Sequence, residues 1–269
     1  MLRALKTFIS NSVNYRMRFS GHGHSIKVPV WAGVGRANRD RHEIHVSAVL
    51  ERLHQRRPGT LLVDVGVNIG QTLIKHFLIV GPEGRYLGFE PNIRSASYID
   101  ELIACNRLKH AQVIPVGLGS SVRLADFFTS TSTSADSGAS INAAFRDPSF
   151  YGAKKLVPIF EADTVLEVLG VNEQYFIVKI DVEGAELEVV QGMRKTLTKL
   201  RPFVIMEILP PTNFSDGVNQ YRLDQAAAIK NFMAEQGYNL SPIGSNGELG
   251  RVQETNDYLF IPKEMSGAV

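Results

Sequence analysis

The chain contains five short runs that are mostly apolar, each bounded by glycine, proline or acidic residues. They cover 61–65, 85–89, 111–119, 175–180 and 203–208. Such runs predict strands that are buried on both faces of a parallel sheet, because a half-exposed strand would alternate polar and apolar residues. Apolar residues at helical spacing between the runs predict helices on both faces. The expected fold class is therefore α/β, with a mostly parallel seven-stranded sheet.

The two ends of the chain are expected to depart from this repeating pattern. Residues 238–243 and 257–261 are predicted to form a closing antiparallel pair, which makes the last strand antiparallel. Residues 1–57 are expected to form a separate N-terminal section, followed by the main domain at 58–269. Within that section, a helix is expected from 39 to 53, where it could cover a ligand pocket.

The N-terminal section is basic, with Arg3, Lys6, Arg16, Arg18 and Lys27 interleaved with apolar residues. This mixture would suit weak association with a membrane surface. Because the basic residues are spread thinly, a cap that packs on the sheet is favoured. The two histidines in Gly21-His22-Gly23-His24 are interpreted as part of a turn rather than as metal ligands.

The first buried strand leads into the turn Asp64-Val65-Gly66-Val67-Asn68-Ile69-Gly70. Gly66 and Gly70 lack a Cβ atom, so the backbone can turn sharply and approach a ligand closely. A dinucleotide site would have the spacing G-x-G-x-x-G, which this turn lacks. Asp64, an acid ahead of the glycines, disfavours phosphate and suits a cationic ligand such as S-adenosylmethionine. The alternative is a purely structural turn.

A second acid, Glu90, follows the second strand in Phe89-Glu90-Pro91-Asn92. An acid at this position can accept hydrogen bonds from both hydroxyls of a ribose. Pro91 ends the strand and fixes the turn after it. The two strand ends together favour a nucleoside-containing ligand over a structural turn.

Three motifs together resemble the FkbM family of S-adenosylmethionine-dependent methyltransferases. They are the glycine turn at 64–70, the segment at 89–92 and Lys179-Ile180-Asp181-Val182-Glu183-Gly184-Ala185-Glu186, which is the most specific of the three. The resemblance covers about 61–262. It implies a Rossmann-like class I methyltransferase fold that binds S-adenosylmethionine and releases S-adenosylhomocysteine.

The cofactor-binding residues are expected at the strand ends of this fold. They are Asp64, Gly66, Asn68, Gly70, Glu90, Pro91, Asn92, Gly119, Ser120 and Asp181. The corner at Gly119-Ser120 is where the resemblance implies adenine contacts. Family members often have an acid there, and the serines of this chain put the contact with the adenine amino group in doubt.

Acids are expected at the ends of four parallel strands, at Asp64, Glu90, Asp181 and Glu207. Neighbouring strands lie about 4.8 Å apart. Like charges this close raise one another's pKa unless a cation lies among them. The cationic donor or a divalent metal would serve. No histidine-rich set or adjacent Asp-Asn pair accompanies Asp181, so a metal is possible but is not predicted.

A hydroxyl acceptor becomes a good nucleophile only when a base removes its proton. The candidate catalytic residues are Asp181, Glu183 and Glu207, since they lie near the expected position of the methyl group. The alternative for Glu183 and Glu186 is a structural role as caps of the following helix.

The segment 129–140 is rich in serine and threonine and too polar to form a core. It is either a lid that closes over the ligands or a tolerated surface insertion, and the sequence supports both equally. As part of a lid, its serines and Asn142 would offer hydrogen bonds to a hydroxylated substrate.

Composition narrows the partners and the compartment. With 29 Lys and Arg against 27 Asp and Glu, the formal charge of +2 gives no argument for nucleic acid. The single Cys105 excludes an intramolecular disulfide and fits a reducing compartment. No apolar run is long enough for a transmembrane helix. A cytoplasmic protein is expected.

The expected function is O-methylation of a small molecule or of a sugar in a glycan or glycolipid. Three alternatives stay open. They are N-methylation, a catalytically silent cofactor-binding scaffold, and a nicotinamide dehydrogenase, which is disfavoured by the glycine spacing.

Overall fold

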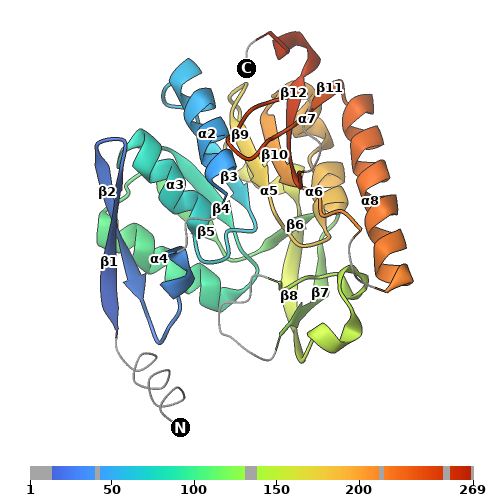
Figure 1. Cartoon of the computed structure of the whole chain (residues 1–269), viewed down its shortest axis with the longest axis horizontal. Coiled ribbons are helices and arrows are strands. Elements are labelled where there is room, and N and C mark those ends of the chain that lie inside the picture. Colours follow the sequence, from blue (N-terminus) through green and yellow to red (C-terminus); the bar gives the residue numbers. More distant parts are fainter. Residues whose placement is uncertain (1–13, 40–42, 131–137, 212–214, 251–254, 268–269) are drawn as a thin grey trace.

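The centre of the molecule is a seven-stranded sheet (Figure 1). The computed structural model describes residues 14–39, 43–130, 138–211, 215–250 and 255–267. The strands in spatial order are β11 (Tyr238–Pro242), β12 (Asp257–Pro262), β10 (Phe203–Glu207), β9 (Ile177–Ile180), β3 (Leu62–Val65), β4 (Tyr86–Phe89) and β5 (Ala111–Ile114). The strands from β10 to β5 are parallel, and β12 runs antiparallel to β10 and β11. The predicted α/β sheet and its antiparallel closing pair are confirmed.

Helices cover both faces of this sheet, as predicted. One face packs against α2 (Ile44–Arg56), α3 (Gln71–Val80) and α4 (Ile93–Asn106). The other packs against α5 (Ala162–Val168), α6 (Glu186–Gly192), α7 (Arg194–Lys199) and α8 (Asp216–Glu235). Side chains alternate along a strand, so Leu62 joins the first core and Val63 the second. The same alternation directs Asp64 and Lys179 towards the α2–α4 layer.

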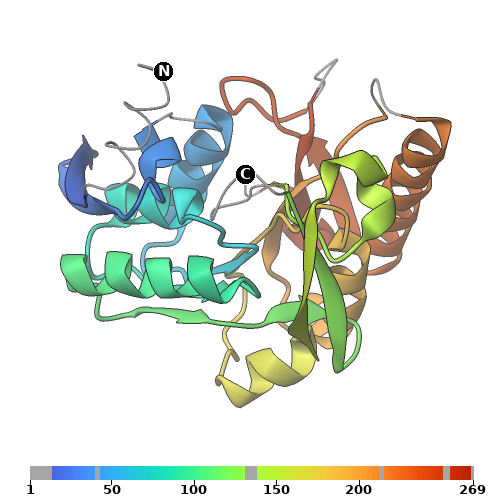
Figure 2. The ribbon, with the colours of Figure 1, turned by 90° about the horizontal axis from the view of Figure 1, so that it is seen from below.

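The prediction of one strand over 111–119 is wrong. β5 ends at Ile114, and β6 (Gly117–Gly119) belongs to a separate three-stranded sheet. Pro115 has no N–H group to continue the hydrogen-bonding ladder. β6 pairs with β8 (Ala153–Glu161), which pairs with β7 (Arg123–Thr129), a strand that the sequence analysis did not predict. Figure 2 shows this green and yellow-green sheet on the opposite side of the molecule from the blue hairpin.

The N-terminal section forms a hairpin of β1 (Tyr15–Gly21) and β2 (His24–Val30), followed by the short helix η1 (Arg36–Arg39). The expected turn at His22 and Gly23 joins the two strands. The hairpin packs on α3 and α4, and it adds Ile26 and Val28 to their core. Arg3 and Lys6, on which part of the membrane-surface alternative depended, lie outside the described residues.

Two further helical segments differ from the prediction, which was one continuous helix from Leu187 to Leu197 and another over 223–236. The chain after Glu183 forms two short helices, α6 and α7, because the backbone leaves the helical conformation at Met193. α8 begins at Asp216, about two turns before the start that its apolar pattern predicts. Among the described residues, no helix has both the length and the apolar character needed to cross a membrane.

Candidate active site

A cavity of about 230 Å³ opens beyond the carboxyl ends of β3, β4, β9 and β10. Ligands of open α/β sheets bind at this edge. Most of the predicted site residues line it together, namely Gly66, Asn68, Glu90, Pro91, Asn92, Asp181, Glu183 and Glu207. The topology therefore brings three separate motifs of the sequence to one cavity.

Four predicted cofactor residues are not part of the cavity lining, namely Asp64, Gly70, Gly119 and Ser120. Gly70 is the N-cap of α3, and a Cβ atom there would lie 2.7 Å from the side chain of Ile99. Gly119 ends β6, and its neighbours Gly117 and Leu118 face the cavity instead. The strand break described above shifts this corner away from the cavity.

Asp64 lies beneath the cavity, inside β3 rather than at its tip. Its carboxylate accepts a 2.6 Å hydrogen bond from the Tyr86 hydroxyl. Burial raises the pKa of Asp64 to about 6, although the charge of Lys179 and the Tyr86 hydrogen bond oppose the shift. One oxygen of the buried acid is thus partnered by Tyr86, and the side chain does not line the cavity.

Gly66 brings two turns of the backbone into contact. It has a φ of 93°, and a Cβ atom built on it would lie 1.9 Å from the carbonyl oxygen of Asp181. No residue with a side chain fits in this space. The turn after β3 and the turn after β9 therefore meet, main chain against main chain, at the floor of the cavity.

Glu90 is held in place by main-chain donors on both sides. Its Oε2 accepts a hydrogen bond from the N–H of Asn68 at 2.7 Å, and its Oε1 from the N–H of Asn92 at 2.7 Å. Burial raises the pKa of Glu90 to about 7, and these two hydrogen bonds act in the opposite direction. Each oxygen retains a further acceptor position, which fits the pair of hydroxyls on a ribose.

A lysine from the small sheet contacts Asn92 from behind the cavity lining. Lys155 of β8 places its Nζ 2.7 Å from Oδ1 of Asn92. The sequence analysis missed it because 153–161 has no motif, and because β8 approaches Asn92 only through tertiary packing.

Three carboxylates gather on the opposite side, where one oxygen each from Asp181, Glu183 and Glu207 lies within 4.8 Å of the others. Such a cluster can share a proton or surround a cation. Burial, followed by the negative charge of Asp181, raises the pKa of Glu183 to about 7. Burial and the charges of Asp181 and Asp257 hold the pKa of Glu207 well above its usual range.

Glu183 is positioned by an irregular segment that follows β7. Arg146 Nη2 lies 2.6 Å from Glu183 Oε2, and Ser140 Oγ donates to the Glu183 carbonyl at 2.5 Å. Tyr221 of α8 donates to the next carbonyl, that of Gly184, at 2.9 Å. Most of the serine-rich segment at 129–140 cannot be compared with the prediction of a lid, because 131–137 lies outside the described residues. Ser140 is described, and its hydroxyl bonds to the protein main chain. Sequence analysis gave no signal for Arg146.

The two glutamates after Asp181 differ in role. Glu186 accepts hydrogen bonds from the N–H groups of Val182 and Gly184, at 3.3 and 3.0 Å, which matches the capping alternative. Glu183 is paired with Arg146 and faces the cavity. Of these two acids, Glu183 is the one available to a ligand.

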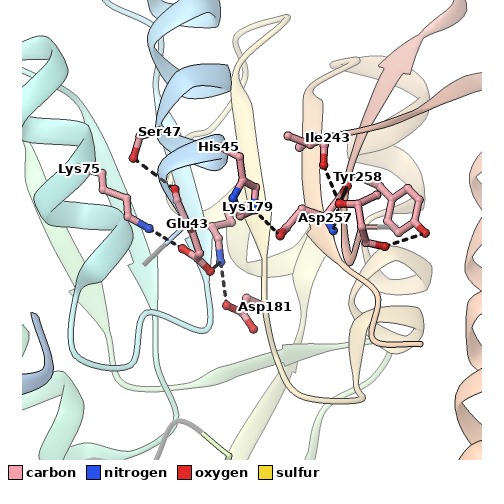
Figure 3. Close-up of polar contacts among 10 residues, drawn as sticks. Glu43, His45, Ser47, Lys75, Lys179, Asp181, Ile243, Asp257 and Tyr258 are labelled. Atoms are coloured by element: carbon pink, nitrogen blue, oxygen red, sulfur yellow. Dashed lines mark hydrogen bonds and ion pairs between the residues drawn. The ribbon is translucent and has the colours of Figure 1, made fainter. Parts of the chain in front are cut away.

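A buried lysine joins the carboxylate cluster to the N-terminal section (Figure 3). Lys179 Nζ lies 2.8 Å from Asp181 Oδ2 and 4.0 Å from a carboxylate oxygen of Glu43. Glu43 also lines the cavity. In the sequence, Glu43 stood out only as part of the helix predicted from 39 to 53.

A comparison with known protein families matches the segments that line the cavity. The family described as the Methyltransferase FkbM domain matches residues 64–240. A search of curated proteins found no match.

Among solved structures, the chain is similar to the methyltransferase FkbM of Methylobacillus flagellatus KT, with 13% identity and a TM-score of 0.50. That alignment covers 96% of this chain and 59% of the other, so the chain spans less than two thirds of that protein. A putative caffeoyl-CoA O-methyltransferase from Staphylococcus aureus has 12% identity and a TM-score of 0.47, covering 80% of this chain and 82% of its own.

The fold is therefore the Rossmann-like fold of the class I methyltransferases, as predicted. The family match spans well over half of the sequence and includes the glycine turn, Glu90 and the carboxylate cluster. The chain belongs to the FkbM family of methyltransferases.

Proposed function

We propose that the protein transfers a methyl group from S-adenosylmethionine to a hydroxyl oxygen of a small molecule or sugar. The observation that carries the proposal is one cavity with two differently built sides. Glu90, oriented by main-chain donors, suits a ribose, and the acids opposite suit a cation.

The donor would lie between the glycine turn and Glu90. When bound, S-adenosylmethionine supplies an electrophilic methyl group on a positively charged sulfur. Gly66 permits close approach of the main chain, and Glu90 would accept hydrogen bonds from the ribose. Asp181 lines the same cavity and would provide negative charge near the sulfonium.

Glu183 is the proposed general base. A base works best when its pKa lies near the working pH, and burial brings the pKa of Glu183 to about 7. It would accept the acceptor's hydroxyl proton as the oxygen–methyl bond forms and the sulfur–methyl bond breaks. Glu207, whose pKa is higher still, would carry a proton and orient the acceptor oxygen through a hydrogen bond.

An isothermal titration with S-adenosylmethionine tests the donor assignment. We expect the wild type to bind and Glu90→Gln to bind at least tenfold more weakly, since two ribose hydroxyls lose an ionised acceptor. The matched control is Glu83→Gln, because Glu83 is exposed and pairs with Lys109 and His110 outside the cavity.

Equal affinity in Glu90→Gln would contradict the ribose assignment. Binding of a nicotinamide dinucleotide in place of S-adenosylmethionine would favour the dehydrogenase alternative. A screen of cell-extract fractions for a mass gain of one CH₂ unit would identify the acceptor. A methylated amine among the products would favour N-methylation, and donor binding without any product would favour the silent scaffold.

A further inference from the structure

Glu43 lies where the N-terminal section meets the cavity. It is the N-cap residue of α2, with a left-handed backbone (φ 57°), and its side chain is 22% exposed. Non-glycine residues adopt this conformation at some cost in free energy. Glu43 lines the cavity, and its carboxylate points towards Lys75 and Lys179 (Figure 3).

Two lysines from different elements converge on this carboxylate. Lys75 of α3 has its Nζ 2.5 Å from Glu43 Oε2, and Lys179 of β9 has its Nζ 4.0 Å from Glu43 Oε1. The Lys179 side chain is 3% exposed and its charge is thus poorly screened by solvent. Lys179 also forms an ion pair with Asp181, whose Oδ2 lies 2.8 Å from Lys179 Nζ.

Glu43 is ionised in this setting. Burial acts to raise the pKa of Glu43, but the charges of Lys179 and then Lys75 outweigh burial and lower the pKa to about 2. Without this negative charge, Lys75 would lose its ion pair, and the ammonium group of Lys179 would be opposed by Asp181 and the buried Asp64. A ligand with its own positive charge would then be repelled.

We propose that Glu43 sets the charge selectivity of the donor site by neutralising Lys75 and Lys179. The cavity can then hold a cationic donor in preference to its neutral product. This inference rests on the proposed function, because it takes the donor to be S-adenosylmethionine. It gives the N-terminal section a direct part in ligand discrimination, beyond packing on α3 and α4.

The test compares two ligands that differ in the charge on sulfur. Dissociation constants for S-adenosylmethionine and S-adenosylhomocysteine are measured by isothermal titration for the wild type, Glu43→Gln and Lys75→Met. We expect Glu43→Gln to lower the preference for S-adenosylmethionine about 5- to 10-fold, and Lys75→Met to raise it. If Glu43 had a purely structural role, its substitution would weaken binding of both ligands equally and leave the ratio of their dissociation constants unchanged.

Glu51→Gln is the matched control. Glu51 lies on the same helix, pairs with His22 and is absent from the cavity lining, so the ratio should stay at the wild-type value. Thermal unfolding establishes whether each variant folds. If Glu43→Gln does not fold, Lys75→Met alone still tests the proposal, because its preference for S-adenosylmethionine should rise.

Ratios that do not move, or that move in the same direction in both variants, would overturn the role of Glu43 while leaving the proposed function intact. A wild type that binds neither ligand would overturn both.

Discussion

The two sides of the cavity are built in different ways. The glycine-turn side, made of the 64–70 turn, Glu90 and Asn92, is organised by main-chain N–H groups and by a glycine that no other residue can replace. The carboxylate side, made of Asp181, Glu183 and Glu207, depends on charged side chains, namely Lys179 of β9 and the distant Arg146. The first is a cradle of main-chain groups from the turns after β3 and β4. The second is a group of acids whose pKa values depend on neighbouring charges, so a single charge substitution can change it.

The largest effect should come from a change that damages both sides at once. In Gly66→Ala the new Cβ would collide with the Asp181 carbonyl, so we expect loss of about 3 kcal/mol or more of stability and of donor binding. Gly59→Ala is the control, because Gly59 also has a positive φ (78°) but nothing lies within 4 Å of a Cβ there.

Strain without collision should cost Gly59→Ala only about 1 kcal/mol. Chemical denaturation of both variants measures the difference. Similar losses in the two would mean that the contact between the turns carries little energy.

A more selective effect should follow from changing the carboxylate side alone. Glu183→Gln should lower turnover about 10²- to 10⁴-fold while donor affinity stays near the wild-type value. Glu188→Gln is the control, because Glu188 pairs with Arg123 and is absent from the cavity lining.

The pH dependence of wild-type turnover is a second test of Glu183 as the general base. A base must be ionised to accept a proton, so kcat/KM should rise with pH up to about 7 and then level off. This rise should disappear in Glu183→Gln. Turnover that keeps its acid limb in the variant would point to another base.

The smallest expected effect concerns stability rather than chemistry. The raised pKa of Glu207 means that the folded protein holds this proton more tightly than the unfolded chain. Stability from this group is therefore present below the ordinary pKa of 4.5 and is lost as pH rises through the raised value. Glu207→Gln removes the titration.

Between pH 6 and pH 9, the Tm of the wild type should fall by about 3 °C more than that of Glu207→Gln. Differential scanning calorimetry at several pH values measures this, with Glu235→Gln, an exposed site at the end of α8, as the control. Identical slopes in all three proteins would show that the cluster does not store this proton.

The sheet could be predicted because its strands are buried on both faces. Every residue of β3, β4 and β9 is buried. Burial on both faces favours mostly apolar residues, so these strands can be recognised as apolar runs in the sequence. The division at Pro115 could not be predicted from apolarity, since Val116 and Leu118 continue the pattern while their backbone leaves the sheet. β7 was missed because most of its residues are only partly buried.

The site could be predicted as far as its motifs extend. Glu90 and Asp181 follow strands whose ends are recognisable in sequence, and both line the cavity. Asp64 lies one residue before the end of β3, and that single step turns its side chain towards α2–α4. Glu43, Arg146 and Lys155 reach the site through long-range packing, for which the sequence contains no local signal.

The contact between Gly66 and the Asp181 carbonyl also limits how the enzyme could respond to its ligands. With no free space between the two loops, neither can shift towards the other unless its neighbour moves in concert. A ligand that tightens one loop would thereby alter affinity at the other side of the cavity, and thermodynamic reciprocity makes the influence equal in the reverse direction.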